Sequence, residues 1–149
     1  MMDLITLALG WVGIYSVLLL SVLGSAMACS KAGQAAIGAM LESESGYGRY
    51  AAVAALPASQ AIFGIVVMFA LNRAVTLQNA LPLLVVGLMT GFALLFCSIK
   101  EGECCASAIM VSKEKPEVFG VSLAPAAVIE GFSVFAFVFA LLVSGGIPK

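Results

Sequence analysis

The chain has 149 residues, of which 62% are hydrophobic and only 10% carry a charged side chain. Soluble globular domains contain about 25% charged residues, so this composition excludes that class. The absence of histidine excludes Ser-His-Asp and Cys-His catalysis and histidine-based metal sites, and a net charge of −1 offers no basic surface for a nucleic acid.

Long stretches without charged residues indicate helices that cross a membrane. A helix needs about 20 apolar residues to span the hydrocarbon core. Such stretches follow one another along the chain at residues 4–30, 50–72, 74–99 and 118–148, and the last contains one charge, that of Glu130. We therefore predict an all-α membrane protein with four transmembrane helices.

Polar residues, Gly and Pro gather between these stretches and indicate the turns. Residues 42–49 separate the first two helices, residues 72–82 the second and third, and residues 113–117 the last two. Because the connections are short, we expect two successive helical hairpins, residues 1–74 and residues 75–149, and no soluble domain.

The first and third helices are expected to protrude beyond the membrane, to about Met40 and about Val111. No basic residue precedes Lys31, so the first helix lacks the positive region of a cleavable signal peptide. We expect it to remain in the mature protein.

The basic residues predict the orientation. Those near the hairpin turns outnumber those at the opposite ends by five to two: Lys31, Arg49, Lys100, Lys113 and Lys115 against Arg73 and Lys149. The positive-inside rule then places both hairpin turns in the cytoplasm and both termini outside.

The two halves of the chain also form an internal repeat. A shift of 70 residues superposes residues 68–71 on residues 138–141 and Gln60 on Glu130. Both halves begin on the same side of the membrane, which indicates a parallel duplication of one hairpin and not an inverted repeat.

Small residues recur every 11 positions in two of the predicted helices. Gly13, Gly24 and Ala35 do so in the first helix, and Gly87 and Ser98 in the third. An 11-residue period keeps these positions on one stripe, where small side chains let helix backbones approach closely. The two helices would then line a tight inner circle, or pack as ordinary neighbours in a four-helix bundle.

Glu130 is the candidate ion carrier. A carboxylate at the centre of a membrane helix costs at least about 2.5 kcal/mol, so such acids usually mark a path for ions or protons. It must be protonated, or paired with a cation, whenever lipid is its neighbour. The alternative is a structural Glu that is hydrogen-bonded inside the bundle.

The second helix offers oxygen ligands that complement this acid. Gln60 has an amide oxygen and Ser59 a hydroxyl, although a lone Ser hydroxyl often bonds its own helix. Pro57 has no backbone N–H and is expected to free a carbonyl near Val53, and the Leu56 carbonyl lies one turn from Gln60 on the same face. Such hard oxygen ligands suit a small hard cation.

The third helix adds two acids, Glu101 and Glu103. Successive helical residues turn by about 100°, so these two cannot both face one site. We expect one to face the ion site and the other to meet Lys100 or headgroup water, and either is equally acceptable as a solvated interfacial group.

The cysteines indicate packing and not redox chemistry. None of the four has C-x-x-C spacing, and all lie in or beside apolar helix: Cys29, Cys97, Cys104 and Cys105. A buried free Cys behaves as a small hydrophobic residue.

Together these features resemble the duplicated four-helix proteolipid, known as the c or K type, of V-type rotary ATPases. The segment Leu56-Pro-Ala-Ser-Gln60, followed by Gly64, carries the resemblance together with the single Glu130 of the last helix. It is most similar to the bacterial Na⁺-pumping branch, and it covers nearly the whole chain.

The resemblance implies a homo-oligomeric ring in the lipid bilayer of a bacterial cell, which carries one Na⁺ or H⁺ per chain past a membrane stator subunit. It places central-stalk subunits at the cytoplasmic loops and implies no cofactor besides the transported ion. The ion-binding residues that it implies, which are the metal ligands if the ion is Na⁺, are Glu130, Gln60, Ser59, the Leu56 carbonyl and Glu101.

This sequence departs from the Na⁺-binding relatives at two positions. They have Gln where this chain has Glu101, and Tyr where it has Phe63. Phe63 cannot hydrogen-bond Glu130, and Glu101 must hold a proton if one Na⁺ is to leave the site neutral.

Other functions remain as alternatives. The chain has no G-x-x-x-x-G-K-[ST] motif, so ATP would bind elsewhere in the complex. A small proton-coupled multidrug exporter also has four helices, but its acid lies in the first helix, which has none here. A purely structural four-helix scaffold would not explain why Gln60 and Glu130 occupy equivalent positions.

Overall fold

The computed structural model describes residues 1–149, and all of its regular structure is helical. The elements in chain order are α1 (Met2–Glu42), α2 (Tyr47–Ala55), the 3₁₀ turn η1 (Leu56–Ala58), α3 (Ser59–Leu71), α4 (Ala80–Glu114), the 3₁₀ turn η2 (Pro116–Val118), α5 (Phe119–Ser122) and α6 (Ala124–Gly146).

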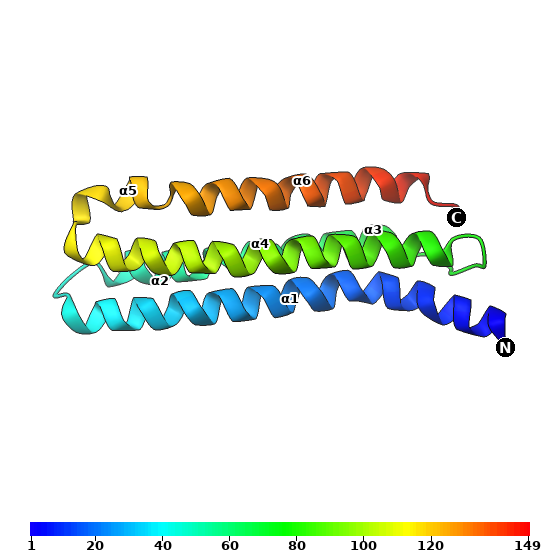
Figure 1. Cartoon of the computed structure of the whole chain (residues 1–149), viewed down its shortest axis with the longest axis horizontal. Helices are drawn as coiled ribbons and strands as arrows, with labels where there is room; N and C mark the ends of the chain where they lie inside the picture. The colour runs from blue at the N-terminus through cyan, green and yellow to red at the C-terminus, as the bar shows by residue number, and fades with distance from the viewer.

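These elements form two hairpins that lie side by side along one axis (Figure 1). The first is α1 followed by α2–α3, and the second is α4 followed by α5–α6. Both chain termini lie at one end of the bundle together with the connection between the hairpins, and the turn inside each hairpin lies at the other end (Figure 1). Four helical segments are long and apolar enough to cross a membrane, as predicted.

The long helices α1 and α4 run past their predicted ends by two or three residues, and they pack against each other through glycine. Gly87 approaches α1 so closely that a Cβ atom there would collide with the carbonyl of Gly13. Further along α4, a Cβ on Gly102 would lie 2.6 Å from the Cα of Ala28. Small residues of α1 and α4 therefore bring the two backbones into direct contact.

The second predicted helix is interrupted at Pro57, where η1 separates α2 from α3. The Val53 carbonyl is not freed, because it accepts the N–H of Leu56, and that expectation was wrong. The carbonyl that leaves the helical pattern belongs to Pro57 itself, and it accepts hydroxyls from Ser25 of α1 (2.9 Å) and Ser98 of α4 (3.3 Å).

The fourth predicted helix is also interrupted, which the sequence pattern did not indicate. A turn at Leu123 separates the short helix α5 from α6, whose first turn contains Pro125. A proline is tolerated in the first turn of a helix because its missing N–H would have no helical partner there.

Arg73, in the connection between the hairpins, joins the ends of α3 and α6. Its guanidinium donates to the backbone carbonyls of Ala70 (2.9 Å), Ser144 (3.0 Å) and Ile147 (2.8 Å). A cation is favourable at the carbonyl end of a helix, and here one side chain serves two helices. The two hairpins are therefore linked at the end that carries the termini.

The Gly87 contact yields a stability prediction. Gly87→Ala should lower the unfolding temperature by about 5 °C, because overpacking a close helix contact costs about 1–3 kcal/mol. Gly33→Ala is the matched control, since a Cβ at Gly33 would meet no atom within 4 Å. Thermal unfolding of both variants in detergent, followed by circular dichroism, measures the difference. Equal unfolding temperatures would contradict the role assigned to this contact.

Candidate ion-binding site

The break at Pro57 places two polar side chains in the first turn of α3. Ser59 and Gln60 follow η1 directly, and Gln60 is fully buried. Both point toward acids on the second hairpin, Glu130 of α6 and Glu101 of α4. Side chains of three helices thus converge in an otherwise apolar bundle.

Glu130 accepts two hydrogen bonds from α3. Its Oε2 lies 3.1 Å from the hydroxyl of Ser59 and 2.7 Å from Nε2 of Gln60. Residues that the internal repeat makes equivalent, Gln60 and Glu130, therefore face each other across the two hairpins. These donors supply partners to a carboxyl group that would otherwise lie among apolar side chains.

Gln60 connects this carboxyl group to a second one. The same Nε2 donates to Oε2 of Glu101 at 3.0 Å, and Glu101 is only 2% exposed. The other polar atom of the amide, Oε1, is buried without a hydrogen-bond partner. A buried carbonyl oxygen without a partner is free to accept a donor or a cation.

Leu56 lies at the edge of this cluster. Its carbonyl accepts the backbone N–H of Ser59, as the last bond of η1. Leu56, Ser59, Glu101 and Glu130 line one pocket of about 340 Å³. The structure thus brings the five sequence-predicted residues to one place, four of them in a hydrogen-bonded network and Leu56 beside it.

Glu103, the other acid of this part of α4, lies apart from the cluster. It pairs with Lys31 of α1 (3.2 Å) and Lys100 of α4 (3.0 Å), and both lysines are exposed. Phe63 of α3 stacks on Phe137 of α6 with ring centroids 5.0 Å apart. Neither Glu103 nor Phe63 contributes a polar atom to Glu130.

Two further residues hold the backbone of the site and were missed from the sequence. Ser25 and Ser98 donate to the Pro57 carbonyl, and Ser25 also accepts the backbone N–H of Ala61 at 3.1 Å. The sequence does contain one indication of their role, which is their position at the small-residue stripes. Ser98 belongs to one stripe, and Ser25 follows Gly24 of the other.

The cluster has the chemistry of a site for a small cation or a proton. It offers two carboxyl groups, an amide, a hydroxyl and a carbonyl, which all provide hard oxygen ligands. Nowhere in the chain do three or more Cys, Asp or Glu side chains gather at one point. Two acids among apolar helices require a proton or a cation to reduce their charge.

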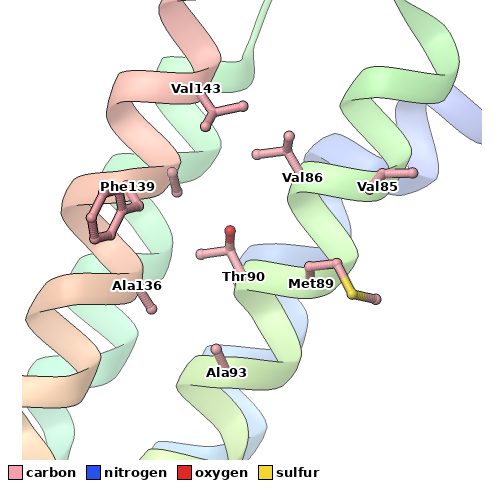
Figure 2. Close-up of a pocket in the computed structure, with 9 residues that line it drawn as sticks. Val85, Val86, Met89, Thr90, Ala93, Ala136, Phe139 and Val143 are labelled. Atoms are coloured by element: carbon pink, nitrogen blue, oxygen red, sulfur yellow. The ribbon is translucent and has the colours of Figure 1, made fainter.

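A second pocket has no comparable chemistry. It has a volume of about 310 Å³, and eight of its nine lining residues are hydrophobic. Figure 2 shows Val86 and Thr90 of α4 facing Ala136 and Val143 of α6 across it. Thr90 alone offers a polar group, so this pocket does not suit a cation.

Comparison with known proteins identifies the family. The model of a family described as the C subunit of ATP synthase matches the chain twice, over residues 12–71 and residues 84–143. The chain belongs to this family of ATP synthase C subunits. The first matched copy contains Ser59 and Gln60 and the second contains Glu101 and Glu130, so each copy supplies half of the cluster.

A curated relative agrees with the family match. The K subunit of the A-type ATP synthase of Methanocaldococcus jannaschii is 32% identical over 127 residues, which cover 83% of this chain and 56% of that protein. The chain therefore spans little more than half the length of this relative. The predicted resemblance to c or K proteolipids is confirmed, and a multidrug exporter is not favoured. With its four apolar helices, this member of the family is an integral membrane protein.

Proposed function

We propose that the chain is the ion-carrying subunit of a membrane rotor ring in a V-type or A-type rotary ATPase. The observation that supports this most is the pairing of Glu130, on the second hairpin, with Ser59 and Gln60 of the first at 3.1 and 2.7 Å. Glu130 is the carrier, and Gln60, Ser59, the Leu56 carbonyl and Glu101 complete its site.

The mechanism follows from the cost of charge in lipid. A site that is neutral when loaded can face the hydrocarbon, whereas an ionised and empty Glu130 cannot. Rotation into lipid is therefore allowed only with the cation bound. Each transported charge exchanges about 2.3 kcal/mol with a membrane potential of about 100 mV, which couples rotation to the gradient.

The cargo is one Na⁺ or one H⁺, and Gln60 distinguishes the two cases. Its Nε2 now donates to both acids, which suits carboxyl groups without a metal. A half-turn of the amide would present Oε1 to Na⁺, and Oε1 has no hydrogen bond to lose. With Na⁺ bound, Glu130 balances its charge and Glu101 must keep a proton for neutrality.

The same proposal assigns the partners. Identical copies form the ring, a membrane stator subunit loads and unloads Glu130, and central-stalk subunits contact the hairpin turns. These turns face the cytoplasm of a bacterial cell and the termini face outward, in agreement with the basic residues near the turns. ATP binds to another subunit.

Replacing the carrier tests the proposal directly. Glu130→Gln should abolish cation transport while the ring still assembles, because the amide keeps size and hydrogen bonding but removes the charge. ATP-driven transport in vesicles, beside a native gel of the ring, measures both. Transport at a near wild-type rate would remove Glu130 from the mechanism.

Chemical labelling identifies the cation. Dicyclohexylcarbodiimide reacts with protonated carboxyl groups in apolar surroundings and should label Glu130. If the cargo is Na⁺, added Na⁺ should slow this labelling, because the carboxylate is then ionised and shielded. Labelling that ignores Na⁺ but declines as pH rises would instead identify the proton as cargo.

The role of Glu101 yields a pH prediction. If the cargo is Na⁺, wild-type transport should decline as pH rises, because a deprotonated Glu101 leaves the loaded site with a net negative charge that cannot face lipid. Glu101→Gln removes this second acid and should flatten the decline. Glu103→Gln is the matched control, because Glu103 pairs with Lys31 and Lys100 outside the site. Identical pH profiles for wild type and Glu101→Gln would exclude Glu101 from the site.

A further inference from the structure

The hydroxyl of Ser25, on α1, is hydrogen-bonded to two backbone groups of the neighbouring segment η1–α3. It donates to the carbonyl of Pro57 at 2.9 Å and accepts the backbone N–H of Ala61 at 3.1 Å. In a regular α-helix these two groups, four residues apart, would bond each other. Here a side chain from a different helix stands between them, which is one of the recognised causes of a helix interruption.

This contact also supplies the missing N-terminal cap of α3. The N-cap residue is Ala58, which has no side-chain acceptor and makes no capping bond. Ala61 is the third residue of α3, and its N–H is one that a capping Ser, Thr, Asp or Asn ordinarily accepts. Ser25, only 6% exposed, provides that acceptor from α1.

The two backbone groups that Ser25 holds flank the ligands of the ion site. Ser59 and Gln60 lie between Pro57 and Ala61, and both donate to Glu130. Fixing the groups before and after them fixes the direction in which the two side chains leave the backbone. Ser98 of α4 adds a second, longer bond to the Pro57 carbonyl but does not reach Ala61.

We infer that Ser25 is a positioning residue of the ion site, which caps α3 from α1 and thereby directs Ser59 and Gln60 toward Glu130. The inference rests on the proposed function for its consequence in transport, but the cap itself is a feature of the fold. Without the hydroxyl, the Ala61 N–H loses its acceptor and the Pro57 carbonyl keeps only the longer bond from Ser98. The first turn of α3 would then fray, and Ser59 and Gln60 would no longer be held in the direction of Glu130.

Four variants of the assembled ring test this inference. Ser25→Ala removes the cap, and Ser25→Thr keeps a hydroxyl. Ser21→Ala is the matched control, because Ser21 is also buried on α1 but donates only to Leu18 of its own helix. Ser98→Ala removes one bond to Pro57 and leaves the contact with Ala61.

Two measurements are made on each ring. The concentration of the transported cation at half-maximal ATP-driven transport should shift about tenfold in Ser25→Ala, equivalent to about 1.4 kcal/mol, and less than about twofold in Ser21→Ala. The maximal transport rate should change by a smaller factor than this concentration does. Ser25→Thr should restore the wild-type half-maximal concentration. Amide hydrogen exchange at Ala61 should accelerate in Ser25→Ala alone.

The outcomes separate this inference from the proposed function. Equal concentration shifts in Ser25→Ala and Ser21→Ala, or an Ala61 amide that is insensitive to Ser25→Ala, would overturn the positioning role. A wild-type ring that transports no cation would contradict the proposed function, and exchange at Ala61 would still test the cap. If Ser25→Ala does not assemble, Ser25→Thr decides. Wild-type exchange at Ala61 together with a wild-type half-maximal concentration supports the inference, and a shifted concentration despite wild-type exchange at Ala61 overturns it.

Discussion

The structure depends on one constraint, which is that acids inside an apolar helical bundle must have polar partners. Glu130 and Glu101 come from different helices and share one amide, that of Gln60. For a single amide to reach both, α3 must approach α4 and α6 at the same level. The glycine contacts between α1 and α4 and the break at Pro57 make this approach possible, because they remove side-chain bulk and redirect the backbone.

Duplication explains how such a site arises from two similar hairpins. Equivalent positions of the two copies hold Gln60 and Glu130, and the pairing of the hairpins brings the two side chains within 2.7 Å. One copy retains the donors and the other the acids. Neither hairpin contains a complete site, so the site exists only when both fold together. The Arg73 contacts with α3 and α6 hold them in that arrangement at the end that carries the termini.

Hydrophobic length and residue type predicted much of this molecule. The charge-free stretches predicted the four helical segments, and the chemistry of Glu130, Gln60 and Ser59 singled out residues that the structure joins. The break at Leu123 and the cap by Ser25 were not predictable in the same way. Both depend on which helices become neighbours, and a Ser hydroxyl beside a glycine stripe has many possible partners until that packing is known.

The equivalence of Gln60 and Glu130 also determines how many ions the proposed rotor ring would move in one turn. In the proposed ring, this chain of four helices would carry one ion, at Glu130, where a chain with a carrier acid in each hairpin would carry two. A ring of given circumference would therefore move half as many cations per revolution. Because the energy of each ATP is then divided among fewer ions, every ion can be driven against a steeper gradient. In the proposed ring, an amide at the position of one carboxylate would therefore lower the number of ions moved per turn and raise the gradient that each ion can oppose.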